Sequence, residues 1–127
     1  MKKVLVVDDQ SGWRNYNSVA VYEVLGKDII LDTASSANEG YTKLLENENE
    51  PYDYILTDMQ MELNYTPLMA GEWLIEQIKL LNSYYKTNVI IISASPKIKL
   101  IAENYNVDYI PKSIALASLD KYKELLK

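Results

Sequence analysis

Short apolar runs alternate along this chain with longer stretches in which apolar residues recur every three or four positions. The short runs are of strand length and rich in β-branched residues, whereas the longer stretches have the period of an amphipathic helix. Five strands are predicted in this way, over residues 3–7, 29–31, 52–57, 89–92 and 108–112. The run 89–92 is apolar at every position, which is typical of a central strand covered on both faces.

The stretches between the strands predict five helices. Trp13 and Val24 lie on one face of the first, and Gly26 is expected to end it. Ser36 and Glu39 have the spacing of a capping box at the start of the second helix. The later helices are expected around residues 74–81, from residue 96 to about residue 106, and from residue 115 to residue 127.

Strands separated by helix-length connections pair in parallel, with right-handed crossovers that place helices on both faces of the sheet. The fold class is therefore α/β: one doubly wound (βα)5 parallel sheet over residues 1–127, with the flavodoxin-like strand order 2-1-3-4-5. Pro111 has no N–H to donate to a neighbouring strand, which favours an edge position for the fifth strand.

Composition narrows the chemistry. The 127 residues fit one domain and include no cysteine and no histidine, which excludes disulfides, Cys- or His-ligated metal sites and histidine-based triads. The formal net charge of −5 argues against a nucleic-acid-binding face. No apolar stretch approaches the roughly 20 residues that span a bilayer, so we expect a cytoplasmic protein without membrane contact.

Polar residues follow the predicted strands at the points where these end. Asp8 and Asp9 follow the first strand, Asp58 follows the third, Ser93 ends the fourth and Lys112 ends the fifth. Ligands of open α/β sheets bind outside the carboxyl ends of the strands. Three carboxylates, a hydroxyl and an ammonium are therefore expected to meet at one edge of the sheet.

Two carboxylates about 5 Å apart repel each other by roughly 3 kcal/mol at an effective dielectric constant of 20. A divalent cation with oxygen ligands, Mg²⁺ or Mn²⁺, would offset this repulsion, and Lys112 would supply a further positive charge. Cations around a carboxylate suit phosphoryl transfer, in which Asp58 attacks phosphorus in line and Ser93 donates a hydrogen bond to the bound group.

Four runs at consecutive strand ends resemble the receiver domains of response regulators in two-component signalling: VVDD at 6–9, YILTDM at 54–59, IISA at 91–94 and YIPK at 109–112. The resemblance covers essentially the whole chain, in order. It implies that Asp58 is the phosphoacceptor. It also implies that Asp9 binds Mg²⁺ directly, that Asp8 positions metal-bound water, and that the backbone carbonyl of Gln60 is a third protein ligand.

The same resemblance implies a switch. Ser93 corresponds to the switch hydroxyl, Tyr109 to an aromatic residue that changes rotamer, and Lys112 to the lysine that pairs with phosphate. The implied phosphodonors are a histidine kinase, a phosphotransfer protein or a small acyl phosphate. The implied targets are a downstream protein or a covalently linked output domain, with a homodimer through the fourth helix and fifth strand. Such a domain is not an enzyme beyond accepting phosphate and slowly losing it.

The chain departs from the family pattern in three places. Met61 is followed by Glu62 where the family usually has proline, and the stretch before the matching glycine, Gly71, is longer than usual. Ser113 stands where the family has a proline in a cis peptide, and a cis bond before another residue costs about 2.5–4 kcal/mol. The segment 93–112 is short, which predicts a reduced or shifted fourth helix.

Two other functions are open on the sequence. The departures favour a receiver-like interaction module that does not need phosphate. A phosphohydrolase of the haloacid dehalogenase type would also use aspartate and Mg²⁺, but it requires Asp-x-Asp after the first strand, and Asp8-Asp9-Gln10 does not fit.

Single residues also have structural interpretations. Lys112 could protect an edge strand from aggregation. Ser93 could satisfy nearby backbone groups. Tyr109 could be ordinary core, because tyrosine fills apolar positions in a chain without phenylalanine. Trp13 and Trp73 are interpreted as packing residues.

Overall fold

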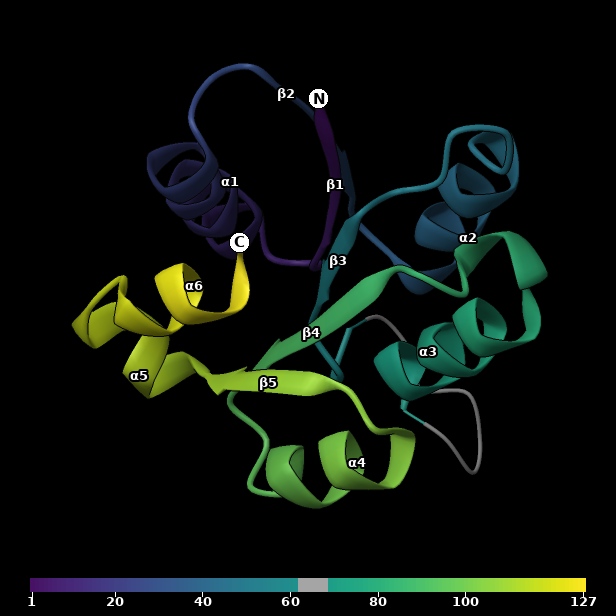
Figure 1. Ribbon diagram of the computed structural model, residues 1–127. Coiled ribbons are helices and arrows are strands. Elements are labelled where there is room, and N and C mark those ends of the chain that lie inside the picture. The colour runs from purple at the N-terminus through teal and green to yellow at the C-terminus, as the bar shows by residue number, and fades with distance from the viewer. Residues whose placement is uncertain (62–68) are drawn as a thin grey trace.

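The computed structural model shows a five-stranded parallel sheet with helices on both faces (Figure 1). Residues 1–61 and 69–127 are described. The strands are β1 (Lys2–Val7), β2 (Ile29–Ala34), β3 (Tyr54–Thr57), β4 (Asn88–Ser93) and β5 (Asp108–Pro111). Their order is β2-β1-β3-β4-β5, which confirms the predicted fold class, the strand order and the edge position of the fifth strand.

Helices flank the sheet in two layers (Figure 1). The helices are α1 (Ser11–Leu25), α2 (Ala37–Glu46), α3 (Ala70–Leu80), α4 (Ile98–Tyr105), α5 (Lys112–Ala117) and α6 (Asp120–Leu125), with a short 3₁₀ helix η1 (Asn82–Tyr84) after α3. Helices α2, α3 and α4 cover one face, and α1, α5 and α6 cover the other. None of the helices in the described part of the chain is long and apolar enough to cross a membrane.

The alternation of side chains along each strand produces two separate cores. In β1, Leu5 and Val7 join the core under α2, α3 and α4. Val4 and Val6 join the core under α1, α5 and α6. The other inner strands divide in the same way, so both faces of the sheet are buried, as the apolar run 89–92 predicted.

Local signals set the predicted helix ends. Gly26 has φ 86°, a conformation that glycine adopts without steric cost, and ends α1. Ser36 caps α2, since its hydroxyl oxygen accepts a hydrogen bond from the Glu39 backbone N–H at 3.0 Å. The Glu39 carboxylate reaches back to the backbone N–H of Ser35, at 3.2 Å. The predicted capping box is thus confirmed, with its reciprocal bond one residue earlier than in the standard motif.

One helix prediction was wrong. The segment 115–127 forms two short helices, because Ser118 has an extended backbone (φ −166°, ψ 167°) between them. The Ser118 hydroxyl accepts a hydrogen bond from the Asp120 N–H at 3.1 Å, so the side chain satisfies a backbone group at the beginning of α6. Tyr122 and Leu126 nevertheless stay buried against the same face of the sheet.

Other boundaries differ by a few residues. The third strand begins at Tyr54, and α3 ends before Leu81. The fifth strand ends at Pro111, so Lys112 is the first residue of α5 and not the last residue of a strand. The predicted fourth helix forms over 8 residues, beginning after Pro96. The predicted irregular loop after Asp58 includes residues 62–68, which lie outside the described residues.

Candidate functional site

Strand register brings two aspartates together. The last residue pair between β1 and β3 joins Val7 to Thr57, so the next residue of each strand is an aspartate, Asp8 or Asp58. The Asp58 N–H donates to the Val7 carbonyl at 3.1 Å, which extends the ladder by one bond. Asp8 is 0% exposed and Asp58 is 6% exposed. The pairing of two apolar strands therefore buries two acidic side chains next to each other.

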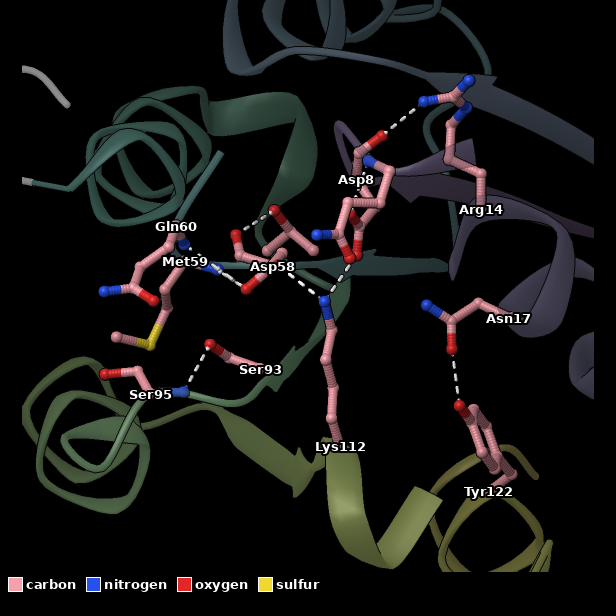
Figure 2. Close-up of polar contacts among 12 residues, drawn as sticks. Asp8, Arg14, Asn17, Asp58, Met59, Gln60, Ser93, Ser95, Lys112 and Tyr122 are labelled. Atoms are coloured by element: carbon pink, nitrogen blue, oxygen red, sulfur yellow. Dashed lines mark hydrogen bonds and ion pairs between the residues drawn. The ribbon is translucent and has the colours of Figure 1, made fainter. Parts of the chain in front are cut away.

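Lys112 joins this pair from the fifth strand-helix junction (Figure 2). Its Nζ atom lies 2.8 Å from Asp58 Oδ2 and 3.2 Å from Asp8 Oδ2. The lysine itself is only 8% exposed. The structure thus brings together three of the predicted site residues, and one ammonium faces two carboxylates, which leaves one net negative charge in a buried site.

The two carboxylates differ in their other partners. Asp58 Oδ1 accepts hydrogen bonds from the backbone N–H groups of Met59, at 2.6 Å, and Gln60, at 3.3 Å (Figure 2). Asp8 Oδ1 accepts from the Gln10 N–H at 2.9 Å, but Asp8 Oδ2 is buried and accepts no hydrogen bond. Asp58 is therefore held at both oxygens, whereas one oxygen of Asp8 has only the nearby ammonium charge.

These surroundings raise the pKa of Asp8 above its usual value near 3.8. Burial, which disfavours the charged carboxylate, is the largest cause, and the charge of Asp58 acts in the same direction. The hydrogen bond from Gln10 and the charge of Lys112 oppose the shift without cancelling it. The ionised Asp8 side chain is consequently under-compensated in this fold.

Gly71, in the first turn of α3, permits the close packing behind Asp58. The Gly71 N–H donates to the Met59 carbonyl at 2.9 Å. A Cβ atom at this position would lie 1.9 Å from the backbone oxygen of Asp58, well inside contact distance. The absence of a side chain at residue 71 lets the start of α3 lie directly on the backbone of the Asp58–Met59 segment.

Two residues of α1 complete the surroundings and were not assigned to the site from the sequence. The Lys112 ammonium lies 4.7 Å from the ring centroid of Trp13, which also packs in the core under α1. Arg14 donates from Nη1 to the backbone carbonyl of Asp8 at 2.9 Å. The signal that could have indicated both is their position in the first helical turn after the paired aspartates.

The remaining predicted site residues lie nearby without joining this network. Asp9 is exposed, and Tyr109 is half-buried on the α2–α4 side of β5. Ser93 is buried, and its hydroxyl oxygen accepts a hydrogen bond from the Ser95 N–H at 3.1 Å (Figure 2). Within the part of the chain that is described, no hydrogen bond or ion pair joins these three side chains to Asp8, Asp58 or Lys112.

A divalent cation has suitable donors here. Over residues 1–61 and 69–127, no cluster of three or more acidic side chains forms a ready-made metal site. Mg²⁺, however, commonly uses one or two carboxylates and fills its other positions with water and phosphate oxygens. The buried Asp8 oxygen without a hydrogen-bond donor, next to the Asp58 carboxylate, fits such an ion.

These features define a flavodoxin-like α/β protein with a buried acid–lysine site at the carboxyl edge of its sheet. The family model for the response regulator receiver domain matches residues 4–123. The chain therefore belongs to the response regulator receiver domain family, whose members are signalling domains of two-component systems.

Solved structures agree with this assignment. A response regulator receiver domain protein from Clostridium thermocellum is 26% identical over 100% of both chains, with a TM-score of 0.69. CheY in a CheX–CheY–BeF3–Mg complex from Borrelia burgdorferi is 25% identical, with a TM-score of 0.72 over 98% of this chain and 86% of that one. A CheY-like receiver protein from Methanospirillum hungatei JF-1 is 26% identical, with a TM-score of 0.68 over 98% of this chain and 92% of that one. No curated protein is similar in sequence to this chain.

Proposed function

We propose that this receiver domain is phosphorylated on Asp58 in a reaction that depends on Mg²⁺ or Mn²⁺, and that phosphorylation switches a protein-binding surface. The observation that carries the proposal is the buried Asp58 carboxylate, 2.8 Å from the Lys112 ammonium and beside a second, under-compensated aspartate. A buried, oriented carboxylate with cationic partners is the arrangement that phosphoryl transfer to aspartate requires.

The chain supplies the nucleophile and its orientation. The hydrogen bonds from Met59 and Gln60 orient the Asp58 carboxylate through Oδ1. Oδ2, which contacts Lys112, would attack phosphorus as the ammonium moves to an oxygen of the phosphoryl group. The bond between phosphorus and the donor's leaving group breaks as the new bond to Oδ2 forms, and the leaving group departs with its electron pair. Lys112 then pairs with an oxygen of the transferred phosphoryl group.

A metal ion would be held by the buried carboxylates of Asp8 and Asp58 and by the backbone carbonyl of Gln60. The exposed Asp9 side chain would turn toward them to bind the ion as well. When bound, it would neutralise charge on the phosphoryl oxygens. Hydrolysis of the resulting acyl phosphate would be slow, so the domain would act as a timed switch and not as an enzyme with turnover of a substrate.

The switch would start at Ser93. Its hydroxyl oxygen accepts from the Ser95 N–H, and a rotation of the side chain toward Asp58 would let its O–H hydrogen donate to a phosphoryl oxygen. Movement at the end of β4 would be transmitted to β5 and Tyr109 and would change the surface of α4 and β5. A downstream protein, a linked output domain or a second copy of the chain would bind this surface.

The phosphodonor would be a histidine kinase or a phosphotransfer protein, with small acyl phosphates as a substitute. Support comes from family membership and from the related CheY of Borrelia burgdorferi, which is known in a complex with CheX, BeF3 and Mg. The intact Asp58–Lys112 pair does not favour the alternative of a module that works without phosphate.

The test is intact-mass measurement after incubation with Mg²⁺ and acetyl phosphate, beside an Asp58→Asn variant. A phosphoryl adduct on the parent protein is expected, and it should be absent from the variant and after chelation of the metal. A folded parent protein that binds Mg²⁺ and gains no adduct from acetyl phosphate or a phosphorylated phosphotransfer protein would contradict the proposal.

A further inference from the structure

Lys112 has a third partner besides the two aspartates. Its ammonium lies 4.7 Å from the centroid of the Trp13 ring, within the roughly 6 Å over which a ring face attracts a cation. Trp13 comes from the first turns of α1, whereas Lys112 begins α5. The contact therefore links the helix that follows the first strand to the residue that follows the last strand.

The Trp13 ring is itself fixed. It packs edge-to-face on the ring of Tyr16, with 5.2 Å between the centroids. The Tyr16 hydroxyl donates to the backbone carbonyl of Ala115 at 2.6 Å. Since Ala115 belongs to the same short helix as Lys112, the two aromatic residues of α1 are tied to the element that carries the ammonium.

A neutral ring is a suitable third partner for this ammonium. Lysine has a flexible four-carbon stem, so two contacts leave the position of its ammonium loosely defined. The Lys112 ammonium contacts two carboxylate oxygens, at 2.8 Å and 3.2 Å. A third carboxylate would hold the ammonium in place but would add to the net negative charge that an incoming phosphoryl group has to approach. The indole face attracts the cation without contributing a negative formal charge, so the ammonium stays available to an incoming phosphoryl group.

We propose that Trp13 is a positioning residue for Lys112: its indole face holds the ammonium at the Asp58 carboxylate and shields it from solvent. The proposal rests on the proposed phosphorylation of Asp58 for its consequence, but the contact itself can be tested without any phosphodonor. Residue 113, which follows Lys112, is serine and not the proline usual in the family. The backbone next to Lys112 is therefore less constrained, and a contact with Trp13 would help to fix the ammonium.

The first experiment measures how fast Lys112 reacts with an amine-labelling reagent, read by peptide mass, in metal-free buffer without a phosphodonor. The variants are Trp13→Leu, which keeps an apolar side chain, and Trp13→Phe, which keeps a ring face. Trp73→Leu is the control, because Trp73 packs on Tyr41 at 5.6 Å in the core on the opposite face of the sheet from α1. We expect roughly three- to tenfold faster labelling of Lys112 in Trp13→Leu, an intermediate rate in Trp13→Phe and the parent rate in Trp73→Leu.

The second experiment compares rates of phosphorylation by acetyl phosphate at saturating Mg²⁺. We expect a roughly three- to tenfold lower rate in Trp13→Leu, partly restored in Trp13→Phe. In a Lys112→Ala background, the same tryptophan substitution should have no further effect, because the ammonium that it positions is gone. A purely structural role of Trp13 would lower the rate by the same factor in both backgrounds.

The outcomes separate the two proposals. Unchanged labelling in Trp13→Leu, or equal effects of Trp13→Leu and Trp73→Leu, would overturn the positioning role. If the parent protein accepts no phosphate, the proposed function fails, and the labelling comparison still decides the contact. If Trp13→Leu does not fold, the comparison between the parent protein and Trp13→Phe decides it, since phenylalanine offers a smaller ring face and should label faster than the parent.

Discussion

Asp8→Asn should make the metal-free protein more stable, although it removes a partner of Lys112. Asp8 is fully buried, one of its oxygens accepts no hydrogen bond, and its pKa is raised, mainly by burial. An asparagine keeps the shape of the side chain and removes the charge. Lys112 would then form an ion pair with Asp58 alone, and the site would lose its net negative charge.

The size of the effect follows from the burial. A buried polar atom without a hydrogen-bond partner costs about 1–3 kcal/mol. The ion pair with Lys112, at 3.2 Å, offsets part of this free-energy cost. The raised pKa of Asp8 indicates that the ion pair does not offset all of it. We therefore expect a net stabilisation of about 1–2 kcal/mol at neutral pH, with roughly 3–5 °C in Tm for each kcal/mol.

The stability difference between Asp8→Asn and the parent protein should increase with pH. Because the native pKa of Asp8 is above the unfolded value near 3.8, the native protein binds more protons than the unfolded chain between the two values. The parent protein therefore loses stability as pH rises through that window, and Asp8→Asn does not lose this contribution. The advantage of the variant should be near zero below about pH 4 and complete above the native pKa.

Urea unfolding followed by circular dichroism, from pH 4 to pH 8 with chelator present, measures this difference. Asp9→Asn is the matched control, because Asp9 is exposed and its substitution should change stability by no more than about 0.5 kcal/mol. A variant less stable than the parent at pH 7, or a difference that is constant over the pH range, would refute the reasoning.

Three further substitutions test single contacts by the same unfolding assay. Gly71→Ala places a Cβ 1.9 Å from the backbone oxygen of Asp58 and should cost about 3 kcal/mol or prevent folding, whereas Gly12→Ala, with nothing within 4 Å of its Cβ, should be neutral or stabilising. Ser36→Ala removes the cap of α2 and should lower the stability by about 1 kcal/mol. Ser18→Ala, inside α1, should leave the stability unchanged, and equal effects of the two substitutions would contradict the capping role. Tyr122→Phe leaves the buried side-chain oxygen of Asn17 without its donor and should cost about 1–3 kcal/mol, against no measurable cost for Tyr85→Phe, where the tyrosine is 78% exposed.

Features encoded within a few neighbouring residues could be predicted from the sequence. The continuous apolar run 89–92 predicted a strand buried on both faces, Gly26 predicted the end of α1, and Ser36 predicted the start of α2. The break at Ser118 could not be predicted in this way. No glycine or proline marks it, and Tyr122 and Leu126 keep one buried stripe across the break. The choice between one helix and two depended on the extended backbone of Ser118, whose hydroxyl bonds to the Asp120 N–H.

The aspartates and the lysine were predictable for a different reason. Asp8 and Asp58 follow strands that pair residue by residue, so the sheet itself places them side by side. Trp13 was not predictable, because an aromatic residue on the inner face of a helix usually indicates core packing. Its contact with Lys112 depends on how α1 and α5 pack across the sheet, which no local pattern encodes.

The charges of the site suggest a function for Asp8, although this residue destabilises the metal-free fold. Asp8, Asp58 and Lys112 sum to one negative charge. Phosphorylation of Asp58 would consume its carboxylate charge and add a phosphoryl group of about −2, so the same residues would then sum to about −2. Lys112 cannot balance that sum, and Arg14 is committed to a backbone carbonyl of Asp8. A divalent cation would bring the sum to about zero. The under-compensated Asp8 therefore weakens the metal-free protein, and its charge would also attract the ion on which the proposed phosphorylation depends.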